Sequence, residues 1–85
     1  MITRKLMPVN IIKGDNFQMM PMSTKLLFYE MVVYSDDSGF ISNSCSILNK
    51  AEASPDNLKM LIAKGFVRVV DGGYYVVSEE DYFHE

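Results

Sequence analysis

Few side chains of this 85-residue chain could carry out catalysis. The single histidine, His84, is the penultimate residue, where chain ends are usually poorly ordered. The single cysteine, Cys45, is interpreted as a small semi-buried helix residue, because no basic residue near it would favour a reactive thiolate. Asp36 and Asp37 lack a nearby histidine or third carboxylate, and with Gly39 they favour a turn over a metal site. We therefore expect no catalytic residue, no metal and no cofactor, and the chain is not predicted to be an enzyme.

Side chains that could contact nucleic acid are concentrated between residues 54 and 64. The amide of Asn57 could hydrogen-bond to a base edge, and Lys59 and Lys64 could contact phosphate. Asp56, Met60 and Ala63 belong to the same candidate recognition face. Further candidate phosphate contacts are Arg4, Lys5, Lys50 and Arg68.

A short helix over residues 54–64 is expected to position this face. Ser54 suits the N-cap, Pro55 suits the first helical position, and Gly65 can adopt the left-handed conformation that ends a helix. At 100° per residue, Leu58, Leu61 and Ile62 share one face and are predicted to enter the core. The opposite face is left available for a partner.

A β-hairpin follows the helix and is predicted to form a wing. Apolar runs at 66–70 and 74–77 flank Asp71-Gly72-Gly73, a strong hairpin signal, and Tyr74 completes the candidate wing site. A second helix over 44–50 and a turn at 51–53 precede the helix at 54–64, and residues 40–41 are expected to form a strand beside the wing. This order predicts an α+β winged helix-turn-helix with three main helices and a small antiparallel sheet.

The first long helix is expected over residues 24–35 and is apolar around most of its circumference. Leu27, Met31 and Tyr34 form an inward stripe. The rest of the surface could be buried in the same chain or could meet another protein or a second copy. The candidate interface residues are Leu26, Phe28, Tyr29, Val32 and Val33.

The totals predict one soluble domain over residues 1–85, with 48% hydrophobic residues and a net charge of −3. Residues 1–14 are expected to form an extended arm, because Pro8 disfavours a helix through them, and residues 79–85 a solvated acidic tail. Neither a membrane span nor a secretion leader is recognised, and one cysteine suits a reducing cytosol. A pI near 5.0 is unusual for a protein that binds duplex DNA.

Residues 15–77 resemble the N-terminal winged-helix domain of phage replisome organisers and related replication-initiation proteins of the DnaD type. The matching residues are Asp15-x-Phe17, Met20-Pro21-x-Ser23, Leu27-Phe28-Tyr29, Asp36-Asp37-x-Gly39-Phe40, Asn43, Ser46-Ile47-Leu48 and the run 53–67. The resemblance implies a phage protein in the bacterial cytoplasm, from a group that recognises origin DNA. The chain departs from the family where DNA contact is expected, with Ser44, Cys45 and Asn49 at positions that commonly hold proline or basic residues and Glu52 in place of a glycine.

Two functional hypotheses follow. The first is a small phage accessory factor or inhibitor that binds a host nucleic-acid-handling or defence protein, as an anti-CRISPR protein does. The second is a DNA-binding module of replication initiation or transcription that acts as a dimer, with residues 54–64 in the major groove. A solvated helix face without a partner is the third interpretation.

Overall fold

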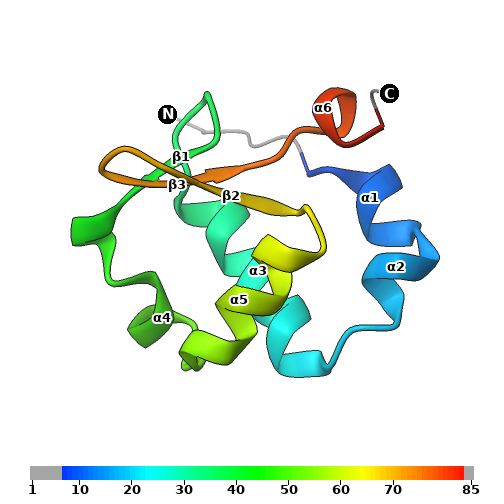
Figure 1. Cartoon of the computed structure of the whole chain (residues 1–85), viewed down its shortest axis with the longest axis horizontal. Coiled ribbons are helices and arrows are strands. Elements are labelled where there is room, and N and C mark those ends of the chain that lie inside the picture. Colours follow the sequence, from blue (N-terminus) through cyan, green and yellow to red (C-terminus); the bar gives the residue numbers. More distant parts are fainter. Residues whose placement is uncertain (1–6, 84–85) are drawn as a thin grey trace, which may run out of the picture.

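The chain folds as an α+β winged helix-turn-helix, and the structure, a computed structural model, describes residues 7–83 (Figure 1). Short helices α1 and α2 precede the long helix α3, and strand β1 leads through a 3₁₀ turn into α4 and α5. Strands β2 and β3 form the C-terminal hairpin, and a last helical turn, α6, follows it. The bounds are α1 Val9–Lys13, α2 Asp15–Gln18, α3 Met22–Tyr34, β1 Phe40–Ser42, the 3₁₀ turn Asn43–Cys45, α4 Ile47–Lys50, α5 Pro55–Ala63, β2 Val67–Val70, β3 Gly73–Val76 and α6 Glu79–Phe83.

The sheet has three antiparallel strands in the order β1-β3-β2, so the wing hairpin pairs with β1 as expected. Val70 pairs with Gly73 at the end of the hairpin, and Gly72 supplies the turn's positive φ of 79°. A Cβ atom on Gly73 would collide with the carbonyl oxygen of Ile41, so only glycine allows β1 to approach β3 at this point.

The core lies between the sheet and the helices, and three phenylalanines form its centre. The rings of Phe17, Phe28 and Phe66 are fully buried and meet edge to face, with centroid distances of 5.2 to 6.0 Å. Leu27 on α3 and Leu61 on α5 are also fully buried. Burial of α3 and α5 against each other fixes the direction in which α5 presents its outer face.

Both chain ends differ from the sequence-based expectation. Residues 9–13 form the helical turn α1 instead of an extended arm, because Pro8 stands before the helix, where its missing N–H is not needed. Residues 79–83 of the expected solvated acidic tail form the helical turn α6, in which Glu80 and Asp81 are exposed. Ser78 Oγ accepts from the N–H of Asp81, and the ring of Tyr82 stacks on Phe66 at 5.1 Å. Residues 1–6 and 84–85 of the predicted arm and tail lie outside the described residues.

Two hydrogen bonds connect α1 near one end of the chain with α6 near the other. The carboxylate of Glu79 accepts from the backbone N–H of Asn10 at 2.9 Å and from its side-chain Nδ2 at 3.1 Å. The expected acidic tail is therefore part of the folded body through residue 83.

The helix predicted over 44–50 is broken into the 3₁₀ turn and α4. Ser46 adopts a left-handed conformation, with φ of 56°, which cannot continue a helix, and Ser42 caps the 3₁₀ turn through its side chain. Glu52, at the position where the resembling family has glycine, also has a positive φ, of 53°. A positive φ, which glycine adopts most easily, is therefore held at this position by a glutamate.

Within residues 7–83, none of the helices has the length and apolar character that crossing a bilayer requires.

Candidate binding surfaces

Helix α5 presents an exposed face of mixed charge. Leu58 and Leu61 anchor its inner side, and the residues left exposed include Asp56, Lys59, Ala63 and Lys64, with Met60 half-buried. Asp56 stands in the first turn, where the helix dipole favours a negative charge and where an approaching phosphate would meet a like charge.

Asn57, the residue predicted to hydrogen-bond to a base edge, makes its hydrogen bonds within the domain. Its Oδ1 accepts from the backbone N–H of Ser54 at 2.9 Å and from the Ser54 hydroxyl at 3.1 Å, which completes a capping box at the start of α5. Its Nδ2 donates to Ser23 Oγ at 3.0 Å and to Thr24 Oγ1 at 3.1 Å on α3. With both ends of the amide bonded, Asn57 would have to break its link between α5 and α3 to read a base.

The candidate phosphate contacts are spread over separate elements. Lys50 at the end of α4 lies 5.3 Å from the ring centre of Tyr34, and Arg68 on β2 lies 6.0 Å from that of Tyr75. Both cations thus sit over aromatic rings, an arrangement that stabilises a charge at a protein surface. Arg4 and Lys5 lie outside the described residues, as does His84.

The edge strand of the wing, β2, exposes two valines beside Arg68. Val69 is 65% exposed and Val70 38% exposed on β2, which lies at the edge of the sheet. At the turn, Asp71 and Gly72 are exposed, Gly73 is buried against β1, and Tyr74 is half-buried. The wing tip therefore offers one carboxylate and no basic side chain to a phosphate backbone.

The candidate interface on α3 is smaller than the sequence suggested. Phe28 is fully buried and Val32 is only 4% exposed, so the two side chains add almost nothing to the exposed face of α3, because α3 is covered on more than one side. Leu26 and Val33 are 47% and 57% exposed, and Tyr29 is half-buried beside Phe17. Leu27 and Met31 of the expected inward stripe are fully buried. Tyr34 is instead 46% exposed, and the ammonium group of Lys50 lies over its ring.

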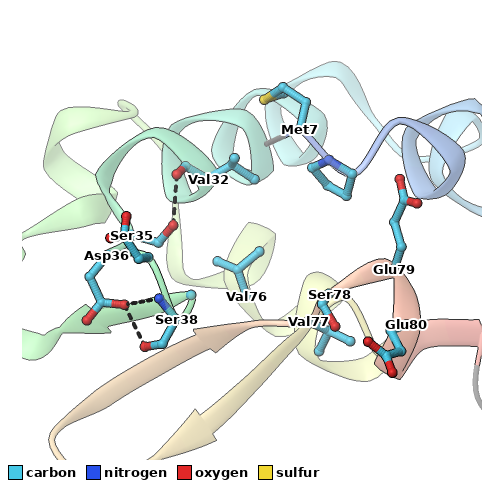
Figure 2. A pocket seen from close by; sticks show the side chains of 13 residues that line it. Met7, Val32, Ser35, Asp36, Ser38, Val76, Val77, Ser78, Glu79 and Glu80 are labelled. Atoms are coloured by element: carbon cyan, nitrogen blue, oxygen red, sulfur yellow. Dashed lines mark hydrogen bonds between the residues drawn. The ribbon is translucent and has the colours of Figure 1, made fainter. Parts of the chain in front are cut away.

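A groove with a volume of about 660 Å³ lies between the end of α3, the turn after it and the segment that joins β3 to α6 (Figure 2). Val32, Val76 and Val77 contribute apolar side chains, with Met7 and Pro8 along one wall. Asp36 stands at one end and Glu79 and Glu80 at the other (Figure 2). The full lining is Met7, Pro8, Val32, Ser35, Asp36, Asp37, Ser38, Gly39, Val76, Val77, Ser78, Glu79 and Glu80.

Asp36 is held in place by the turn that it begins. Its Oδ1 accepts from the Ser38 hydroxyl at 2.7 Å, the Ser38 N–H at 2.9 Å and the Phe40 N–H at 3.0 Å. The Ser38 hydroxyl, followed by the backbone N–H of Phe40, lowers the pKa of Asp36 below its usual value. The carboxylate is therefore ionised at neutral pH, and the turn predicted for this aspartate pair is present.

Sequence reasoning missed this groove because its walls come from three distant parts of the chain. One local signal was present: Ser78 three residues before Asp81 is a helix-capping pattern, and it would have predicted α6 in place of a free tail. The pairing of Asn10 with Glu79 has no such signal. Within residues 7–83, no group of three or more metal-ligating side chains comes together.

Comparison with protein-family models, with curated proteins and with solved structures finds no significant match to this chain. The resemblance of residues 15–77 to phage replisome organisers therefore stays a prediction.

Proposed function

We propose that this winged helix acts by binding a protein, as an accessory factor or inhibitor of a host protein that handles nucleic acid or takes part in defence. The observation that carries the proposal is that few positive charges gather on the predicted recognition surface. Asn57 is committed to the fold, Asp56 stands at the start of α5, and Lys50 and Arg68 lie over tyrosine rings on other elements. A domain that grips duplex DNA needs several cations side by side to neutralise phosphates.

The phage origin and the anti-CRISPR-like role belong to this proposal. Their support is the resemblance of residues 15–77, the net charge of −3 and the apolar side chains exposed on β2 and α3. A second copy of the chain is a further candidate partner, which would use Leu26 and Val33 on α3.

DNA binding is the second candidate function. It is favoured by the exposure of Lys59 on α5 and of Lys64 directly after it, because the corresponding helix enters the major groove in helix-turn-helix proteins. In this alternative the two lysines contact phosphate and the wing approaches the backbone.

Affinity capture from a bacterial lysate, with and without nuclease treatment, tests the proposal. A protein retained equally after nuclease treatment, and retained by Lys59→Glu/Lys64→Glu, is the expected result. Loss of all captured protein after nuclease treatment would contradict direct protein binding, because the association would then depend on nucleic acid.

A further inference from the structure

We infer that the groove between α3 and α6 docks a segment of a partner protein in which lysine or arginine side chains flank an apolar side chain. Val32, Val76 and Val77 form its floor and are 4%, 7% and 1% exposed, and Met7 along one wall, 41% exposed, is the most exposed apolar side chain of the lining. Its rim carries four carboxylates, from Asp36, Asp37, Glu79 and Glu80. None of the described lining residues is a lysine, arginine or histidine, so the charge at the rim is of one sign.

The volume of the groove is that of a small-molecule site, so it can take up a side chain of a bound segment. A volume of about 660 Å³ falls within the range of roughly 300–1,000 Å³ that is typical of sites for small ligands. Met7 is 41% exposed at the wall, and its flexible thioether can adapt to different apolar side chains.

Two of the rim carboxylates are positioned in advance. Asp36 is fixed by Ser38 and Phe40, and Glu79 is fixed by the two nitrogens of Asn10. These side chains have already lost much of their rotamer freedom on folding, so a bound cation does not have to order them. Asp37 and Glu80 are exposed, which lets them attract a partner from solution.

The inference rests on the proposed function, which supplies the reason for a basic segment. Proteins that handle nucleic acid present lysine and arginine to phosphates. The acidic groove would bind the same kind of side chain, at a site that is not on the outer face of α5. The segment that precedes Met7 contains Arg4 and Lys5, so the chain's own N-terminus is the competing occupant that the test must exclude.

The test uses the full chain and a fluorophore-labelled, capped peptide of sequence Lys-Arg-Leu-Arg-Lys. Anisotropy at low salt gives its dissociation constant, and nitrogen–proton correlation spectra with unlabelled peptide locate its site. We expect saturable binding, with the largest shifts in residues 36–39 and 76–80. Asp37→Asn/Glu80→Asn should weaken binding roughly three- to tenfold, since each exposed charge pair contributes modestly.

The matched control is Asp15→Asn/Asp71→Asn, which removes the same charge from two exposed positions that do not line the groove. It should change the dissociation constant less than twofold. Equal weakening by both double variants, or shifts centred on another surface, would overturn the inference, because attraction would then be non-specific. Binding that is detected only in Arg4→Gln/Lys5→Gln would also overturn it, since the chain's own N-terminus would then be the occupant.

Failure of this test leaves a different signature from failure of the proposed function. If the groove does not bind the peptide but the lysate partner is still retained after nuclease treatment, the partner uses another surface and the protein-binding proposal survives. If retention also depends on nucleic acid, both fail.

Discussion

Replacing Asn57 by alanine separates a structural role of this residue from a role in reading DNA. The change removes the capping-box acceptor of α5 and the two donors that link α5 to α3. Thr24 is fully buried, and its hydroxyl would lose the partner that the structure gives it.

The magnitude follows from these contacts. Loss of half the capping box costs about 1 kcal/mol, and a buried hydroxyl left without its partner costs about 1–2 kcal/mol. We therefore expect Asn57→Ala to lower the free energy of unfolding by about 2–3 kcal/mol. In a domain of this size that corresponds to a fall in Tm of about 10–20 °C.

Urea unfolding followed by circular dichroism measures the effect as a shift of the midpoint at unchanged slope. Asn57→Asp should lose less than Asn57→Ala, because its carboxylate can still accept from Ser54 near the helix N-terminus. Asn49→Ala, at an exposed asparagine of α4, is the matched control and should cost less than about 0.5 kcal/mol. An equally small loss for Asn57→Ala, accompanied by loss of duplex binding, would refute the structural assignment and favour the base-reading role.

Three further predictions follow from the fold. Gly73→Ala should destabilise the domain by more than about 2 kcal/mol in the same urea assay, because its Cβ meets the carbonyl of Ile41; a loss below about 0.5 kcal/mol would show that β1 can move aside cheaply. The folded-state pKa of Asp36 is lowered, so the stability that this carboxylate contributes is present above its unfolded pKa of about 3.8 and is lost as pH falls through the folded pKa. Asp36→Asn should therefore flatten the acid side of a profile of Tm against pH, measured by thermal denaturation from pH 2.5 to 7. An unchanged profile would contradict the assignment. Leu26→Lys/Val33→Lys should raise the dissociation constant of any self-association about tenfold or more in sedimentation equilibrium, because these exposed α3 residues would no longer bury apolar surface in a dimer. A wild-type chain that stays monomeric at every concentration would remove the dimer proposal.

The elements that could be predicted from sequence are those whose signals are local. Ser54 and Pro55 begin α5 as predicted, and the glycine-containing turn after Val70 forms the hairpin. These residues act on their own neighbours, so the rest of the chain does not need to be known.

The elements that could not be predicted depend on contacts between distant segments. Helices α1 and α6 are too short to be stable alone and hold because Glu79 binds Asn10 and Tyr82 stacks on Phe66. Periodicity could not show that Phe28 would be buried, because an all-round apolar helix gives no direction to the core. The candidate site was likewise only partly predictable. The mixed charge of α5 could be predicted from the sequence, whereas the hydrogen bonds of Asn57 to α3 and the acidic groove could not, because they depend on distant segments.

The account's central claim is that the described recognition surface has too little positive charge to hold a duplex by itself. Fluorescence anisotropy of the full chain with a random-sequence duplex, titrated at low salt and repeated as salt is raised, tests it most directly. The account predicts no submicromolar binding at low salt and no change on Lys59→Glu/Lys64→Glu. Submicromolar affinity that falls steeply with salt and is abolished by that double variant would contradict it, because only neutralisation of phosphates produces such a slope.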